Sequence, residues 1–174
     1  MTDFLSLAES RYSVRSFTDR KVEPEKLEKI LQAGRVAPTA VNNQPQVIYV
    51  LQSPEALARM EQATKYLFGA PQALLVCYDE NICWKNRHHE DAGRPSGEVD
   101  ASIVLTHMML QAWELGIGSC WVGVFEFDQV RQLFDLPANI HPVALMPIGY
   151  AAQDGVASAR HSQRKPLEET VRYL

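Results

Sequence analysis

The feature that most constrains the fold is a long helical segment that lacks a polar face. From Glu98 to Gly116, apolar residues fall on all sides of an α-helix: Val99, Ala101, Ile103, Val104, Leu105, Met108, Met109, Leu110, Ala112, Trp113 and Leu115. Such a helix lies either in the centre of a core or in an interface. Gly116 and Gly118 predict its end. We expect the rest of the chain to be organised around this segment.

Helices and strands alternate along the remaining chain. Apolar periodicity and capping residues predict helices from Asp3 to Ser10, from Glu23 to Ala37, from Ser53 to Ala63 and from Asp128 to Phe134. Compact apolar runs predict strands at 47–51, 73–78 and 142–150, with an extended piece at 119–124. Loops are expected at 38–45 and 80–97, and a polar tail from residue 153. This order predicts one α+β domain over residues 1–174, with helices around a small sheet.

Bulk composition narrows the class of partner. A net charge of −4 and a pI near 5.7 give no general attraction to nucleic acid or to an anionic membrane. No apolar run reaches the roughly 18 residues of a membrane span, and residues 1–4 lack the basic region of a secretory signal. Cys77, Cys83 and Cys120 form no CxxC pair. We expect a soluble cytoplasmic protein with reduced thiols.

A short basic segment near the N-terminus is the first candidate for a binding site. Arg11-Tyr12-Ser13-Val14-Arg15-Ser16-Phe17 places two arginines four residues apart around a serine. Arginine offers a planar set of donors that suits phosphate, and the serine hydroxyl adds another donor. The same residues also fit an exposed basic turn. The segment alone leaves both interpretations open.

Other catalytic patterns are weak in this sequence. Gly116-Ile117-Gly118 follows a helix rather than a strand, which argues against a dinucleotide-binding fold. His88-His89-Glu90 does not predict a metal site, because adjacent side chains diverge and no third ligand is implied. Cys120 lies in an apolar run and fits a packed thiol better than a nucleophile. The lack of an evident acid–base set favours chemistry carried by an organic cofactor.

Taken in order, several motifs resemble the FMN-dependent nitroreductase-like flavoproteins. They are Arg11-x-Ser13-x-Arg15-x-Phe17, Pro38-Thr39-Ala40-x-Asn42-x-Gln44-Pro45, the helix from Asp100 through Leu115-Gly116-Ile117-Gly118, Cys120-Trp121-x-Gly123, Met146-Pro147-Ile148-Gly149-Tyr150, and Arg164-Lys165-Pro166-Leu167. The resemblance spans nearly the whole chain. It implies a three-layer fold with a small, mostly antiparallel central sheet flanked by helices, and a long central helix at a dimer interface.

The resemblance also implies a cofactor site shared by two subunits. In a homodimer, each FMN would be contacted by both chains. Arg11, Tyr12 and Ser13 would bind the phosphate and ribityl chain, Arg15 would tune the flavin ring, and Arg164 and Lys165 in the tail 153–174 would complete the phosphate site and the dimer. The second chain would contribute Pro38, Thr39, Ala40, Asn42 and Gln44. Backbone at Val122 and Gly123 would approach the ring.

The function implied is ping-pong hydride transfer from NAD(P)H, through the flavin N5, to a nitroaromatic, a quinone or a similar small acceptor. Two alternatives remain at this point. One is a flavin-binding or storage protein with low turnover, and the other is a related flavin reaction such as dehalogenation or dehydrogenation. The region between the second strand and the central helix is shorter than in larger members. Lys65 is a weak match to a middle Asn/Lys contact of those members.

Overall fold

The computed structural model describes residues 3–87 and 93–174, and its elements follow the alternation expected from the sequence. The helices are α1 (Phe4–Ser10), α2 (Pro24–Arg35), the 3₁₀-helix η1 (Ala40–Asn42), α3 (Pro54–Ala63), α4 (Gly97–Glu114), α5 (Phe127–Leu133) and α6 (Leu167–Thr170). The strands are β1 (Gln46–Leu51), β2 (Gln72–Asp79), β3 (Gly118–Ser119) and β4 (Ile140–Gly149).

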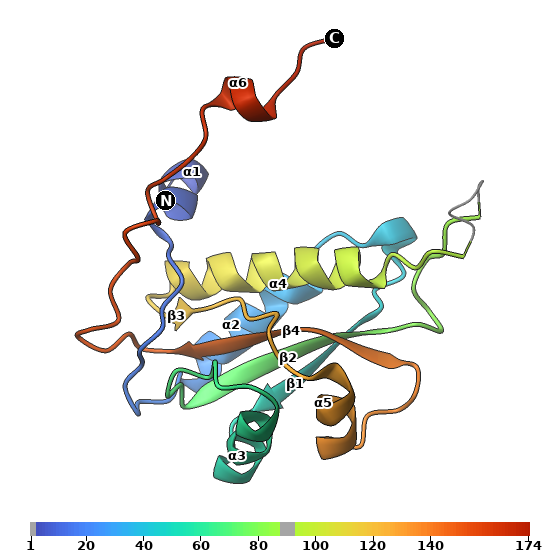
Figure 1. Ribbon diagram of the computed structural model, residues 1–174, viewed down its shortest axis with the longest axis horizontal. Helices are drawn as coiled ribbons and strands as arrows, with labels where there is room; N and C mark the ends of the chain where they lie inside the picture. Colours follow the sequence, from blue (N-terminus) through green and yellow to red (C-terminus); the bar gives the residue numbers. More distant parts are fainter. Residues whose placement is uncertain (1–2, 88–92) are drawn as a thin grey trace.

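In the described residues the sheet has the order β1-β2-β4-β3, with each neighbouring pair antiparallel. Helices α2 and α4 cover one face, and α3 and α5 cover the other (Figure 1). A single parallel bridge joins Ser13 to Ser119 at the β3 edge. The predicted α+β class and the three-layer arrangement with a mostly antiparallel sheet are confirmed.

Strand β2 contributes to two hydrophobic cores, one on each face of the sheet. Every residue from Gln72 to Tyr78 is buried, so both faces of the strand are covered. Because side chains alternate along a strand, Leu74 and Val76 pack with α2 and α4, whereas Leu75 and Cys77 pack with α3 and α5. The continuous apolar run in the sequence is therefore the mark of a strand buried on both sides.

Local signals account for most helix ends. Asp3 caps α1 by accepting from the Ser6 amide at 3.3 Å, and Ser53 caps α3 by accepting from the Ala56 amide at 3.1 Å. Gly116 adopts φ 74° and ends α4, as the sequence predicts. Asp128 was expected to cap the following helix, but α5 begins at Phe127 and Asp128 lies in its first turn. Its carboxylate there still favours the positive helix end.

Helix α4 has one buried side and one open side in the single chain. The side of α4 that faces the sheet is buried and includes Asp100, Ala101, Val104, Leu105 and Met108. On the opposite side Val99 is 61 % exposed, and it borders a shallow hollow that also includes Ile103, Thr106 and His107. Glu98 and Ser102 line the same hollow, so the open side mixes polar and apolar residues, and the expectation of a helix without a polar face holds only in part.

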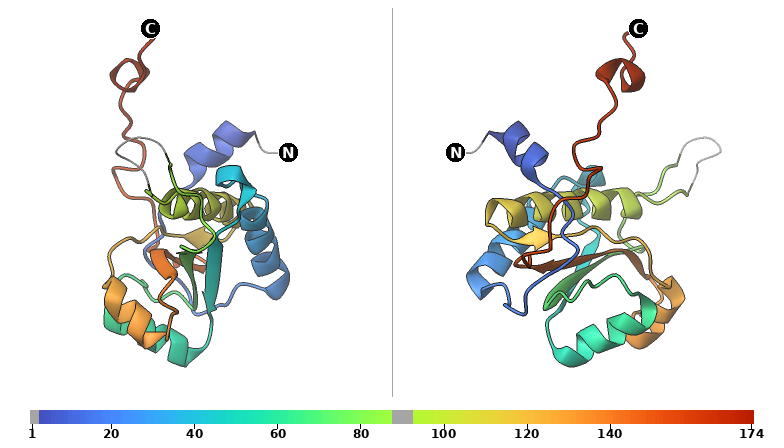
Figure 2. Two further views of the ribbon diagram at one scale, coloured as in Figure 1. Left: turned by 90° about the vertical axis from the view of Figure 1, so that its right-hand side faces the viewer. Right: turned by 60° about the vertical axis from the view of Figure 1, so that its left-hand side comes forward.

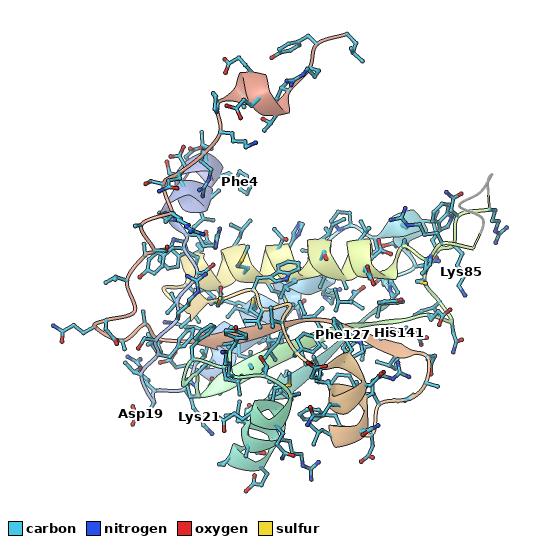
Figure 3. The ribbon with its side chains drawn as sticks, viewed as in Figure 1. Phe4, Asp19, Lys21, Lys85, Phe127 and His141 are labelled. Atoms are coloured by element: carbon cyan, nitrogen blue, oxygen red, sulfur yellow. The ribbon has the colours of Figure 1, made fainter. Side chains whose placement is uncertain are left out.

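Two terminal segments project from the body of the domain. Helices α1 and α6 contain no buried residue, and the end of the chain extends away from the sheet in both views of Figure 2. Phe4, on α1, is 67 % exposed (Figure 3). Within the described residues, no helix is both long and apolar enough to cross a membrane. Cys77, Cys83 and Cys120 are buried free thiols.

Candidate functional site

The backbone around Val14 runs extended along the edge of the sheet. The Val14 amide donates to the Ser119 carbonyl at 2.9 Å, and the Val14 side chain is fully buried. It packs so closely on Gly118 that a Cβ there would lie 2.8 Å from a Val14 methyl group. Alternation along an extended segment then directs Ser13 and Arg15 away from the core. Strand β3 thus presents the basic segment on the surface.

Hydrogen bonds join the start of the C-terminal tail to the basic segment 11–17 and to Thr18. The Thr18 amide donates to the Tyr150 carbonyl at 2.9 Å, and the Ala152 amide donates to the Ser16 carbonyl at 3.0 Å. The Ser16 hydroxyl also donates to Asp154 Oδ1 at 2.7 Å. These bonds lead the chain from the end of β4 back along the basic segment, so the following tail residues lie beside it.

The two segments enclose a cationic pocket of about 400 Å³. Its lining is Arg11, Tyr12, Ser13, Arg15, Ser158, Arg160, His161 and Arg164. The rings of Tyr12 and His161 lie 6.0 Å apart, and Tyr12 also packs edge-on against Trp113 of α4 at 4.9 Å. Four arginines from both ends of the chain therefore line one pocket, and three of them, Arg11, Arg15 and Arg164, are residues that the sequence placed in one site.

The electrostatics of this cationic pocket favour an anion. Burial lowers the pKa of the Arg11 guanidinium, and repulsion from Arg164 lowers it further. None of the described residues lining the pocket is acidic, so no carboxylate among them offsets the positive charge. Phosphate, with a double charge and several acceptor oxygens, matches this donor set.

Cys120 lies directly beneath the cationic pocket. Burial raises the pKa of its thiol, although Arg15, Ser13 and Arg11 act in the opposite direction. The thiol contacts the Trp121 carbonyl at 3.7 Å. A buried thiol with a raised pKa remains protonated at neutral pH and is a poor nucleophile. This supports a packing role for Cys120.

The predicted loop at 38–45 lies at the opposite end of α4. Part of it forms the 3₁₀-helix η1, which the sequence did not predict. Val41, Asn42 and Gln44 have φ values of 48°, 58° and 52°, which is unusual for residues other than glycine. The Gln44 amide donates to Thr39 Oγ1 at 3.0 Å, and the Ala40 amide donates to Asp100 Oδ1 at 2.9 Å. Pro38, Thr39, Ala40, Asn42 and Gln44 thus share one strained loop.

The remaining predicted residues have distinct positions. Val122 pairs with Leu145 at the sheet edge, and Gly123 follows it with open space where a side chain would be. Lys165 pairs with Glu169 at 3.5 Å and does not line the cationic pocket. Lys65 lies over the ring of Tyr66. His88, His89 and Glu90 fall outside the described residues, and elsewhere no group of three His, Cys, Asp or Glu side chains is arranged to hold a metal.

Sequence reasoning did not assign three residues of the cationic pocket to the site: Ser158, Arg160 and His161. The available signal was the density of basic residues in the tail, where Arg160 and His161 precede Arg164 by only a few positions. In an irregular segment, spacing does not determine which side chains face the same way. Only the path of the tail reveals that Arg160, rather than Lys165, accompanies Arg164.

Fold and site define a class of α+β protein with an arginine-lined pocket at the sheet edge and a long helix beside it. The chain belongs to the nitroreductase family, whose model matches residues 8–66 and 64–150.

Individual proteins agree with this assignment. A nitroreductase family protein of Clostridium difficile 630 is 42 % identical, with a TM-score of 0.92 and coverage of 99 % of this chain and 98 % of that one. A protein of Desulfovibrio desulfuricans solved in complex with FMN is 27 % identical, with a TM-score of 0.79 and coverage of 100 % and 98 %. The FMN reductase [NAD(P)H] of Bacillus subtilis is 29 % identical over 173 residues, which cover 91 % of this chain and 69 % of the relative.

Proposed function

We propose that the protein is an FMN-dependent oxidoreductase that takes hydride from NAD(P)H and reduces small oxidised acceptors, with nitroaromatics and quinones as the typical class. The observation that carries the proposal is the cationic pocket, in which four arginines converge without an acidic partner among its described lining residues. The names of the relatives, an FMN reductase and an FMN-bound protein, supply the cofactor that fits.

The residues present fit the phosphate end of FMN. Arg11, whose pKa is lowered first by burial and then by Arg164, would recover favourable interactions when a dianion enters between the two guanidinium groups. Ser13 and Tyr12 would supply neutral contacts, and Arg160 would add a further guanidinium. Arg15 is the remaining cation of the pocket, and it would stabilise negative charge that the cofactor gains on reduction. Bound FMN would supply the redox chemistry, which explains why the chain itself carries no acid–base set.

We further propose that the working unit is a homodimer, because one chain separates the two halves of the site. Tyr12, which lines the cationic pocket, packs against Trp113, whereas the loop with Asn42 and Gln44 is bonded to Asp100 through the Ala40 amide. Thirteen residues of α-helix separate Trp113 from Asp100, which is about 20 Å along the axis. In a pair with antiparallel α4 helices, the loop of one chain would lie beside the cationic pocket of its partner.

The open side of α4 favours the same assembly. Val99 and Ile103 present apolar surface there, and α1 and α6 project without burying a residue. A second copy would cover this apolar surface and give the projecting segments a surface to pack on. The free buried thiols fit a reducing compartment, and we propose a cytoplasmic location.

The test begins with the visible spectrum of the purified protein. We expect a yellow protein, or one that binds added FMN, whose colour is lost anaerobically with NADH or NADPH and returns with a nitroaromatic or quinone. A protein that binds FMN but is not reduced by either nucleotide would instead be a flavin-binding or storage protein. Reduction without reoxidation by these acceptors would point to another flavin reaction. Absence of FMN binding would refute all three.

A further inference from the structure

Asp100 is a buried carboxylate without a cationic partner in the described part of the structure. It lies in the first turn of α4 and is only 2 % exposed. Its Oδ1 accepts from the Ala40 amide at 2.9 Å, and its Oδ2 accepts from the Ser96 hydroxyl at 2.7 Å. Both partners are neutral groups. The first belongs to the strained loop, and the second immediately precedes α4.

Packing alone does not explain a carboxylate in this position. Burying an ionised group is unfavourable unless hydrogen bonds and favourable dipoles compensate for it. The helix N-terminus supplies the dipole, and the two donors supply charge-assisted hydrogen bonds. Ala101 and Val104, which follow Asp100 on the buried side of α4, are apolar. An acid among them is accounted for by its polar partners, and one of these is the Ala40 amide of the loop.

The loop needs such a restraint because its backbone is strained. Val41, Asn42 and Gln44 all have positive φ, a conformation that persists only when surrounding contacts enforce it. Most hydrogen bonds of the loop are internal: Gln44 donates to Thr39 Oγ1 and to the Asn42 carbonyl, and the Asn42 and Asn43 amides donate to the Thr39 and Ala40 carbonyls. The bonds to other described segments are those of Ala40 to Asp100, of Asn43 Nδ2 to the Ile82 carbonyl at 2.9 Å and of the Asp79 amide to the Pro45 carbonyl. Only the Asp100 bond ties the 3₁₀-helix η1 to α4, the element about which the two copies would pair.

We propose that Asp100 is a positioning residue: it holds the 40–44 loop in the strained conformation that directs Asn42 and Gln44 toward the cofactor bound with the second chain. The inference rests on the proposed function, and it assigns to Asp100 a role that goes beyond packing. The Ser96 hydroxyl orients the carboxylate so that Oδ1 faces the loop. Because the Ser96 amide donates to the Trp84 carbonyl at 2.8 Å, the same residue links the loop to Trp84.

Two substitutions of Asp100 distinguish the effect of its hydrogen bond to the loop from the effect of its negative charge. Asp100→Ala removes both bonds and leaves the Ala40 amide without its acceptor. Asp100→Asn keeps an oxygen for Ala40, and its amide group can donate to Ser96 Oγ. We expect Asp100→Ala to weaken FMN binding by about tenfold or more, the loss of one charge-assisted hydrogen bond, and Asp100→Asn to restore most of it. Met60→Ala, at a fully buried residue of α3, serves as a control for general destabilisation.

Ala40→Pro tests the same bond from the other side, and it leaves α4 intact if Asp100→Ala does not fold. The preceding residue, Thr39, already has the extended backbone that proline requires of its neighbour, with φ −132° and ψ 159°. This variant lacks the donor while Asp100 is retained. We expect a loss of FMN affinity similar to that of Asp100→Ala.

Amide hydrogen exchange in the FMN-free protein gives an independent readout. We expect Asp100→Ala to accelerate exchange at residues 40–44 but not at Leu75 or Val76 in β2. Three results would overturn the proposal. Asp100→Ala could bind FMN as tightly as the wild type, or lose no more FMN affinity than Met60→Ala at equal folded fraction. Asp100→Asn could also lose as much FMN affinity as Asp100→Ala. If the wild-type protein binds no FMN, the proposed function fails, and unchanged loop exchange in Asp100→Ala would separately refute the positioning role.

Discussion

At the scale of single residues, Arg11 carries the strongest electrostatic conflict in the cationic pocket. Its guanidinium is partly buried and lies close enough to Arg164 for each to repel the other. Without a bound anion, this arrangement costs stability. With a phosphate between them, the same two groups become its ligands. Arg11 is therefore the residue whose removal distinguishes an anion site from a basic turn.

We expect Arg11→Ala to weaken FMN binding by about ten- to one-hundredfold, since a charge-assisted hydrogen bond is worth about 1.5–3 kcal/mol. Removing the repulsion from Arg164 should at the same time leave the FMN-free protein as stable as the wild type, or slightly more so. Fluorescence titration with FMN and thermal unfolding of the FMN-free protein measure the two effects. Arg59→Ala, which removes an exposed charge on α3, is the control. Equal FMN affinity in both variants would contradict the assignment of Arg11.

A second polar cluster secures the end of β4. The Tyr150 hydroxyl donates to Glu23 Oε2 at 2.6 Å, and Lys26 donates to the Tyr150 oxygen at 2.9 Å. The pKa of Glu23 falls to about 2, chiefly because of the Tyr150 hydrogen bond, with its own backbone amide and Arg20 adding to the effect. Since the folded-state pKa lies below the unfolded value, the carboxylate stabilises the fold above about pH 4.5, and this contribution disappears as the pH falls toward 2.

Tyr150→Phe should accordingly lower the Tm at pH 7, and its difference from the wild type should shrink as the pH is lowered from 5 to 2. Thermal unfolding at a series of pH values measures this. Tyr49→Phe, at a half-buried tyrosine of β1, should show a difference that does not change over the same range. A Tyr150→Phe difference independent of pH would show that Glu23 is not the coupled group.

The sequence predicted that basic residues form the site, but it identified only some of the residues that line the pocket. Arg11, Ser13 and Arg15 were predictable because an extended segment fixes which side chains share a face, here confirmed by the burial of Val14. The pairing of Arg160 with Arg164 was not, because the tail is irregular and its path depends on hydrogen bonds to Ser16 and Thr18. The role of Asp100 was also hidden, since a single acid in the first turn of a helix has an ordinary explanation in the helix dipole.

At the scale of elements, α4 depends on close contact with β2 at its first residue. A Cβ on Gly97 would lie 2.0 Å from the ring of Tyr78. Tyr78 in turn stacks on His141, whose Nε2 lies 2.9 Å from Glu80. Glu80 also pairs with Lys85, and Figure 3 shows Lys85 and His141 toward the same end of the sheet. The first residue of α4 therefore packs against a cluster formed by Tyr78, His141, Glu80 and Lys85.

We expect Gly97→Ala to destabilise the protein by about 1–3 kcal/mol through overpacking. Gly123→Ala, where no atom lies within 4 Å of the added Cβ, should leave the stability of the FMN-free protein nearly unchanged. Urea unfolding of both variants provides the comparison. Equal stability of the two would mean that the Tyr78 ring moves aside at little cost.

Element prediction succeeded where local chemistry and burial agreed. The ends of α1, α3 and α4 follow their caps and Gly116, and β1, β2 and β4 follow apolar runs. It failed where local chemistry offers equivalent choices: Glu126 and Asp128 are both acids, and the structure begins α5 between them. The 3₁₀-helix η1 was missed because Val41 disfavours a positive φ, and its conformation there depends on tertiary contacts.

At the scale of the whole molecule, the proposed dimer depends on the open side of α4. Val99→Glu adds a charge where a second copy would pack, while in a monomer the side chain is 61 % exposed and an acid suits the first turn of the helix. We expect this variant to be monomeric by analytical ultracentrifugation and to lose FMN affinity. Val36→Glu, equally exposed at the end of α2, should change neither property. A wild-type protein that is already monomeric would refute the dimer.

The placement of the strained loop and the cationic pocket at opposite ends of α4 has a genetic consequence. If each site combines the pocket of one chain with the loop of the other, two defective chains can complement each other. In a mixed dimer of Arg11→Ala with Asp100→Ala, one site would inherit both defects and the other neither. Mixing and reassociating the two weakly binding proteins should therefore restore wild-type FMN affinity at one of the two sites in each mixed dimer, whereas either variant reassociated alone should keep its lowered affinity.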